Sequence, residues 1–237
     1  MCALSFYHMK KLFIVGNWKS NKTIKETEKW LHDFSDGFNK ANIKLGDKKV
    51  IIAPPFTSLE HAHYCSGNLK LSLEFAAQDV SPLEEGSYTG EVSARQIKEL
   101  ADYVIIGHSE RRTNFYENGE MIKKKITISR QYRLTSILCV SDLKQIHDAK
   151  FMIHNSNCIL AYEPLSAIGS GLPDTPQNAE SVAAKIKEIV NDAPVLYGGS
   201  VTSLNVNSFT KMPSIDGVLV GGASLDPLEF LNIVQNA

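Results

Sequence analysis

Eight short apolar segments, each followed by a helical or loop segment, constrain the fold of this chain more than any other feature. Each segment is too short for a core helix, so each predicts a buried strand. Successive parallel strands need a crossover of about a dozen residues, usually a helix, and eight such units favour a closed (β/α)₈ barrel over an open doubly wound sheet. The expected strands are 12–15, 50–53, 71–77, 103–106, 134–140, 159–161, 195–197 and 217–220.

The segments between these strands predict helices, and no Pro/Ser-rich linker or change of composition divides the chain. One barrel domain over residues 1–237 is therefore expected. Asp36-Gly37 is expected to end the first helix. Met9-Lys10-Lys11 looks like a natural start, so residues 1–8 are expected to be an N-terminal extension. The predicted helices are 23–38, 58–64, 97–100, 121–132, 142–153, 180–190, 205–209 and 227–234.

Composition excludes several classes of protein. With 237 residues, 43% of them hydrophobic, the chain can bury a core without a metal or disulfide staple. A net charge of -1 and the lack of a basic stripe interleaved with aromatics argue against nucleic acid as a partner. The densest basic run, Lys123 to Lys125, is expected to be a solvated helix face. No apolar run reaches the roughly 18 to 20 residues of a membrane helix, and residues 2–7 are too short for a signal peptide.

The cysteines and histidines predict neither a disulfide framework nor a metal site. Four scattered cysteines without a CxxC pair fit reduced thiols in a cytoplasmic protein. His61 and His63 have the spacing of a metal-binding pair, but nothing near them in the sequence completes a site.

Glu163 is the first candidate catalytic residue. Pro164 removes a backbone donor and favours extended geometry in the residue before it, so the strand at 159–161 should stop at Glu163. The small, apolar, glycine-bearing segment 167–171 has the composition of a lid that folds over a ligand. A solvated Glu at an ordinary strand end is the alternative that these residues alone leave open.

Three further side chains follow strand ends and are expected at the same mouth of the barrel. If extended geometry persists after residue 15, Asn17 and Lys19 point to one side and Trp18 to the other. His108 stands at a strand-to-helix transition, where the helix N-terminus disfavours imidazolium and favours a neutral hydrogen-bond donor.

Two glycine pairs, Gly198-Gly199-Ser200 and Gly221-Gly222-Ala223, follow the last two strands, where (β/α)₈ barrels commonly bind phosphate. The mouth thus combines a carboxylate base, a neutral electrophile, a fixed cation, a phosphate cradle and a lid. This combination is suited to moving a proton next to a carbonyl group.

The chain resembles the triosephosphate isomerase family from about Met9 to its C-terminus. Six blocks carry the resemblance in order, beginning at Gly16, Tyr88, Gly107, Ala161, Tyr197 and Gly221: GNWK, YTGEVS, GHSERR, AYEP, YGGSV and GGASL. The resemblance implies a TIM barrel that interconverts dihydroxyacetone phosphate and glyceraldehyde 3-phosphate in glycolysis and gluconeogenesis, through an enediolate and without cofactor or metal.

The same resemblance assigns residues by position. Glu163 matches the base, His108 the electrophile, Lys19 and Asn17 the substrate-contacting pair, and Glu110 a supporting carboxylate beside the lysine. The phosphate contacts match Gly169, Ser200, Gly221 and Gly222, and the apolar clamp over the base matches Ile168 and Leu219. The loop 78–90, with Thr89, resembles the arm that reaches into a partner subunit, which implies a homodimer.

Departures from the family pattern keep two alternatives open. Ser166 and Leu172 replace an aromatic residue and a lysine that flank the lid, and Ser141-Asp142 replaces a Gly-Glu pair before a shortened fifth crossover. A non-catalytic or impaired phosphosugar-binding barrel would fit these changes, but every charged group at the mouth is present. Another phosphosugar isomerase on the same barrel would not predict the His-Ser-Glu and Tyr-Glu-Pro blocks.

Overall fold

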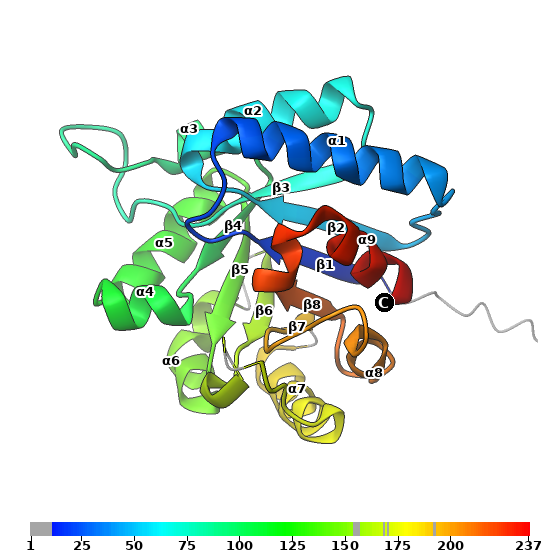
Figure 1. Ribbon diagram of the computed structural model, residues 1–237. Helices are drawn as coiled ribbons and strands as arrows, with labels where there is room; N and C mark the ends of the chain where they lie inside the picture. The colour runs from blue at the N-terminus through cyan, green and yellow to red at the C-terminus, as the bar shows by residue number, and fades with distance from the viewer. Residues whose placement is uncertain (1–10, 154–156, 168, 170, 192) are drawn as a thin grey trace, which may run out of the picture.

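The computed structural model describes residues 11–153, 157–167, 169, 171–191 and 193–237, so the expected extension at 1–8 lies outside the described residues. Eight parallel strands close into one barrel in sequence order, as predicted, with β1 paired to both β2 and β8 (Figure 1). The strands are β1 (Leu12–Asn17), β2 (Lys48–Ala53), β3 (Leu73–Ala77), β4 (Tyr103–Ile106), β5 (Thr135–Val140), β6 (Cys158–Tyr162), β7 (Val195–Tyr197) and β8 (Gly217–Val220).

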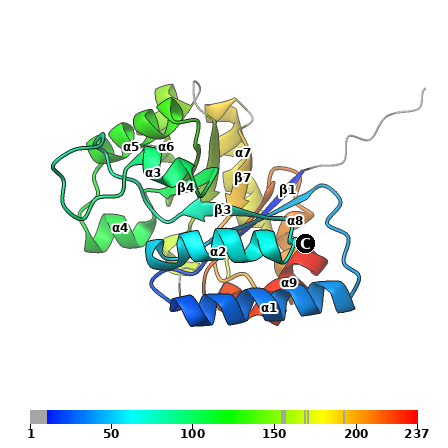
Figure 2. The same ribbon diagram turned by 90° about the horizontal axis from the view of Figure 1, so that it is seen from above.

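Helices surround the barrel, and the long loop between β3 and α3 projects away from it (Figures 1 and 2). The α-helices are α1 (Ile24–Lys40), α2 (Phe56–Asn68), α3 (Ala94–Lys98), α4 (Ser109–Asn114), α5 (Gly119–Gln131), α6 (Leu143–Ile153), α7 (Pro176–Val190), α8 (Val206–Thr210) and α9 (Pro227–Asn236). Two 3₁₀ turns follow strands, η1 (Leu165–Ala167) and η2 (Gly222–Leu225). None of the described helices is long and apolar enough to span a bilayer.

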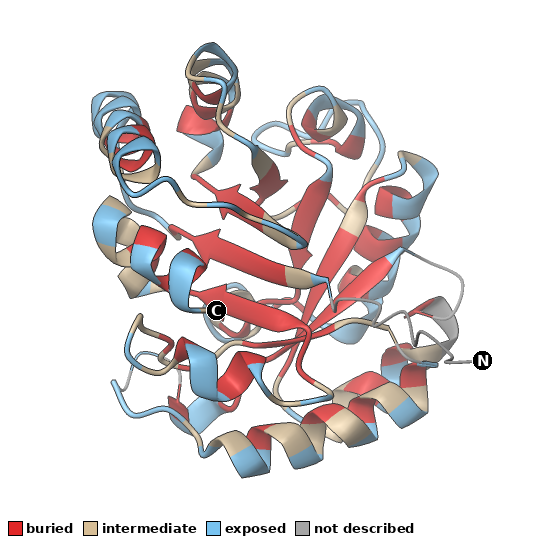
Figure 3. Cartoon of the chain, turned by 90° about the vertical axis from the view of Figure 1, so that its right-hand side faces the viewer, coloured by how far each residue is buried: buried red, intermediate tan, exposed pale blue. Residues whose placement is uncertain are grey.

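The core has two layers because strand side chains alternate between the faces of the sheet. Phe13, Val15 and Ile51 belong to the cluster inside the barrel, whereas Ile14 and Ile52 pack outward against the helices. The strands are therefore buried on both faces, and the helices only on the face toward the barrel (Figure 3). This explains why the strands are short, continuously apolar runs.

The first helix does not end at Asp36-Gly37 as expected, but continues to Lys40. A Cβ on Gly37 would lie 2.8 Å from Leu231 Cδ2, on α9. The glycine therefore lets α1 and α9 approach closely instead of stopping the helix. A capping box of Thr23 and Glu26 fixes the start of α1.

The expectation of a solvated face at Lys123 to Lys125 is wrong for its last member. Lys123 and Lys124 are exposed, but Lys125 is 1% exposed. Lys125 lies three residues after Ile122 and four before Ser129, both buried, so the helical period places it on the inner side of α5.

The fifth crossover carries α6, a helix of 11 residues. Among its side chains that the structure describes, Ile146, Ala149 and Ile153 are buried, and the helix contacts α5, α7 and β5. This short helix therefore packs on both neighbouring helices and on the barrel.

Candidate active site

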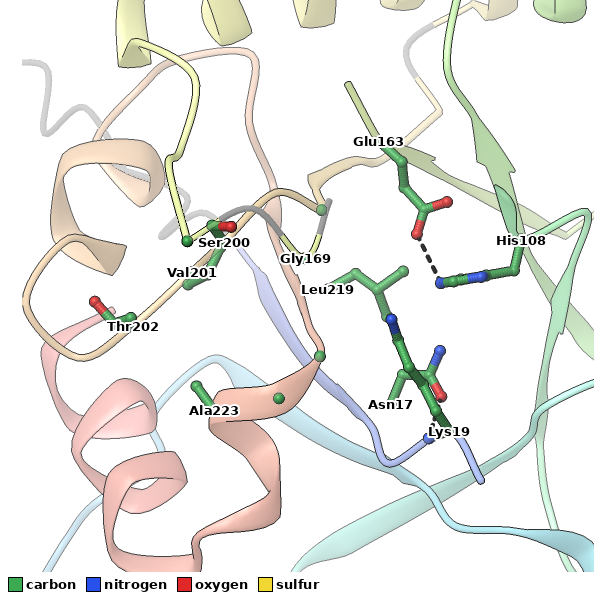
Figure 4. A pocket seen from close by; sticks show the side chains of 14 residues that line it. Asn17, Lys19, His108, Glu163, Gly169, Ser200, Val201, Thr202, Leu219 and Ala223 are labelled. Atoms are coloured by element: carbon green, nitrogen blue, oxygen red, sulfur yellow. Dashed lines mark hydrogen bonds and ion pairs between the residues drawn. The ribbon is translucent and has the colours of Figure 1, made fainter. Parts of the chain in front are cut away.

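A pocket of about 250 Å³ opens at the carboxyl ends of the strands (Figure 4). Among the residues expected at the mouth, the pocket is lined by Asn17, Lys19, His108, Glu163, Gly169, Ser200, Leu219, Gly221 and Gly222. Glu110 joins the site through Lys19, and Ile168 lies outside the described residues. The fold thus gathers at one pocket side chains that are far apart in the sequence.

Glu163 is the first residue after β6, as the proline predicts, and its backbone N–H donates to the Val140 carbonyl at 2.8 Å. The residue is 3% exposed. Its Oε1 lies 3.1 Å from His108 Nε2 (Figure 4), and its Oε2 accepts from the Ser109 N–H at 3.3 Å. The carboxylate is therefore held between two donors in a place that excludes most water.

His108 is the N-cap of α4, and its Nδ1 accepts from the backbone N–H of Glu110 at 3.2 Å. Because an accepting nitrogen carries no proton, the neutral imidazole has its proton on Nε2 and donates toward Glu163. The expected neutral donor at a helix start is thus consistent with the hydrogen bond on Nδ1 and the close contact of Nε2 with Glu163.

Lys19 and Asn17 line the pocket, although extended geometry does not persist between them. β1 ends at Asn17, and Lys19 has a φ of +53°, in the left-handed region. The Lys19 N–H donates to Asn17 Oδ1 at 3.0 Å, and its Nζ lies 2.5 Å from Glu110 Oε1. Trp18 turns away into the outer core, with its ring 4.9 Å from that of Trp30.

The loops after β7 and β8 form the opposite wall of the pocket (Figure 4). Ser200 has a φ of +48°, and Gly222 begins the 3₁₀ turn η2. Backbone N–H groups of two such loops and a short helical turn are suited to bind an oxyanion. Across the described ranges, no group of three His, Cys, Asp or Glu side chains is placed to hold a metal ion.

Hydrogen bonds hold the chain at the start of the expected lid, 167–171, and shortly after it. Ser200 Oγ donates to the carbonyl of Ala167, the first residue of that segment, at 2.6 Å. After it, the Asp174 N–H donates to Tyr197 Oη at 2.8 Å. Ser166 and Leu172, the two departures, are exposed, and neither makes one of these two bonds.

Sequence reasoning missed several residues that support the site. Cys139, inside the barrel, has its thiol pKa raised well above the usual value by burial and then by the nearby Glu163 carboxylate, so it stays protonated. Gln78 bonds to the backbone of Lys19, and Glu117 bonds to that of Gly107. No local pattern marks these residues, because each acts on a segment distant in the chain.

Comparisons with known proteins show the family to which the chain is similar. A family model described as triosephosphate isomerase matches residues 12–237. The triosephosphate isomerase of Mesomycoplasma hyopneumoniae (strain 7448) is 42% identical, over 97% of this chain and 100% of the relative. Those of Mycoplasmopsis agalactiae and Aquifex aeolicus are 38% and 36% identical, each over 96% of this chain and over 96% and 100% of the relative.

Proposed function

This chain belongs to the triosephosphate isomerase family, and from that membership we infer that it interconverts dihydroxyacetone phosphate and D-glyceraldehyde 3-phosphate. The contact between Glu163 and His108 is the observation that carries the chemistry, because it joins a desolvated carboxylate to an imidazole that presents Nε2–H. The reaction needs no net gain or loss of protons, which suits a single carboxylate that takes a proton and returns it.

We propose that Glu163 removes a proton from one substrate carbon and delivers it to the neighbouring carbon. A substrate carbonyl in the pocket would take the His108 Nε2–H that now points to Glu163, which frees the carboxylate to face carbon. His108 then stabilises the enediolate oxygen, and Lys19 with Asn17 binds the substrate from the β1 side.

The phosphate group is proposed to lie against Gly169, Ser200, Gly221 and Gly222, whose loops form the far wall of the pocket. Leu219, 5% exposed at the end of β8, is proposed to form the described half of the apolar clamp over Glu163. Exclusion of water would keep the enediolate from losing its phosphate.

We also propose a single-domain cytoplasmic enzyme that forms a homodimer through the arm 78–90 and Thr89. Large aromatic side chains stand exposed on the arm and after α4: Tyr88 is 45% exposed on the arm, and Phe115 and Tyr116 are 63% and 84% exposed after α4. Such surfaces are typical of protein interfaces. Sedimentation velocity at micromolar concentration should give a dimer, and a monomer alone would contradict the proposal.

The isomerase is tested by converting glyceraldehyde 3-phosphate and reducing the dihydroxyacetone phosphate formed in a coupled assay. Rapid turnover that Glu163→Gln abolishes is the expected result. A folded, dimeric sample without turnover would favour the alternative of an impaired phosphosugar-binding barrel, disabled at the lid flanks or the fifth crossover.

A further inference from the structure

Gln78, the first residue after β3, joins two other strand ends through one side-chain amide. Its Nε2 donates to the carbonyl of Lys19 at 2.8 Å and to that of Ala53, the last residue of β2, at 2.8 Å. Both partners are acceptors only, so the contacts also fix which end of the amide faces them.

Lys19 needs such support because its backbone is left-handed, with a φ of +53°. This conformation is unfavourable for a residue with a side chain and persists only where neighbours hold it. The Lys19 N–H is held by Asn17 Oδ1 and its carbonyl by Gln78, so side chains fix both sides of the residue. The ammonium of Lys19 therefore reaches the pocket from a backbone that Gln78 braces.

Asp79, the next residue, braces the other side of the site through a four-charge cluster with Arg111, Glu117 and Lys125, of which Glu117 and Lys125 are buried. Its two oxygens contact Lys125 Nζ at 2.6 Å and Arg111 Nη2 at 2.8 Å. Both cations also bind Glu117 Oε2, at 2.6 and 2.8 Å. Glu117 Oε1 then accepts from the Gly107 N–H at 3.0 Å, directly before His108.

Gly107 has a φ of +69°, and a Cβ there would lie 2.8 Å from Arg112 Nη2. The chain therefore turns sharply between β4 and His108, and the bond to Glu117, which does not line the pocket, holds this turn.

We propose that Gln78 and Asp79, at the base of the arm, are positioning residues of the isomerase reaction. Gln78 fixes Lys19, and Asp79 fixes the turn that carries His108 through Arg111, Lys125 and Glu117. Neither residue lines the pocket. This inference rests on the proposed function, because it assigns each residue an effect on a different part of that reaction.

The two residues should affect different kinetic constants. Lys19 attracts the substrate's phosphate in the ground state as well as in the transition state, so its displacement raises KM at least as much as it lowers kcat. The bond from His108 to oxygen strengthens as charge develops, so its displacement lowers kcat with KM unchanged. Misplacement by about 1 Å can cost roughly 100-fold.

The experiment compares Gln78→Leu and Asp79→Asn with wild type, with Gln235→Leu as a matched control at an exposed position on α9. Gln78→Leu should raise KM and the inhibition constant of inorganic phosphate together, by about tenfold or more. Asp79→Asn should lower kcat by about tenfold and leave both of those constants unchanged. Gln78→Glu, which keeps the shape but loses both donors, should behave as Gln78→Leu does and serves if that variant folds poorly.

Two results would overturn the proposal. One is a phosphate inhibition constant in both Gln78 variants within twofold of wild type. The other is the same pattern of change in kcat and KM for the Gln78 and the Asp79 variants. A general loosening of the arm would produce this result. Inactive wild type would instead refute the proposed function.

Discussion

Replacement of Lys125 by methionine should strongly destabilise the protein. Lys125 is 1% exposed and its ammonium lies 2.6 Å from both Asp79 Oδ1 and Glu117 Oε2. Although burial acts to raise it, hydrogen bonds from Lys125 and Arg111 bring the pKa of Glu117 below its usual value. Methionine occupies the buried space of the Lys125 side chain without a charge. It leaves the two carboxylates with one cation, Arg111.

The size of the effect follows from the cluster. Two cations and two carboxylates balance in the native protein, and removal of one partner from a buried pair costs about 3–5 kcal/mol because the remaining charge is unpaired. Since the total free energy of unfolding is about 5–15 kcal/mol for a domain, this loss would be a large share of it. Little of the loss comes from packing, because methionine matches the length of the lysine stem.

Urea unfolding at pH 7 and a fixed protein concentration measures this loss, because the stability of an oligomer depends on concentration. The midpoint should fall with the m-value unchanged. Asp79→Asn restores the balance of charge, so Lys125→Met should cost about 1–3 kcal/mol less in that background. Burial is the main reason that the pKa of Asp79 is raised, which indicates that its neutral form is tolerated. A loss below about 1 kcal/mol, or the same loss in both backgrounds, would refute the reasoning.

Three further predictions concern the base, the barrel floor and metal dependence. Glu163→Asp withdraws the carboxylate by one methylene and should lower kcat by about 100-fold or more, measured in the coupled assay; near wild-type turnover would remove Glu163 from its role. Burial raises the pKa of Tyr103 to about 12, so on raising the pH this phenol ionises in the unfolded chain before it does in the folded protein. The free energy of unfolding should therefore fall between about pH 10 and 12, by up to about 1.4 kcal/mol per pH unit. Tyr103→Phe should lessen this slope in urea unfolding at pH 9 to 11, and an unchanged slope would contradict the assignment. Dialysis against EDTA should leave turnover unchanged, since no step of the proposed mechanism uses a metal ion. Loss of turnover that Mg²⁺ or Zn²⁺ restores would refute this prediction.

The barrel and the strand-end residues Glu163 and His108 were accessible to sequence reasoning because local chemistry specifies them, whereas Gly169 and Leu219 were assigned only by the family resemblance. Pro164 ends β6 at Glu163, and the transition after Ile106 makes His108 the cap of α4. Each of these effects acts within a few residues, where periodicity and turn chemistry are informative. Closure of the barrel then brings the strand ends together without any further signal.

The supporting residues could not be predicted in this way, because their partners are distant in the chain. Lys125 belongs to a basic run that resembles a solvated face, and only Asp79 and Glu117 account for its burial. Gln78 lies in a turn-rich loop and acts on Lys19. The two residues meet only because the ends of three strands lie side by side in the barrel. The predicted helix end at Asp36-Gly37 was wrong for a similar reason, since tertiary packing against Leu231 outweighed the local preference of glycine for a helix end.

Glu110 links the two donors of the site and explains how buried charge is tolerated before substrate binds. Its backbone N–H fixes the tautomer of His108, and its carboxylate holds the ammonium of Lys19 at 2.5 Å. His108 Nε2 in turn lies 3.1 Å from Glu163 Oε1, so each of the four groups has a partner in the free protein. An unpaired charge in such a place would be costly, and a loosely held one would have to reorganise during reaction. In the proposed reaction, substrate would therefore exchange partners with groups already in position: its oxygen would replace Glu163 at His108, and its phosphate would compete with Glu110 for Lys19. The residues that brace Lys19 and His108 from behind preserve the geometry through this exchange, which is why the arm base influences the reaction without touching the substrate.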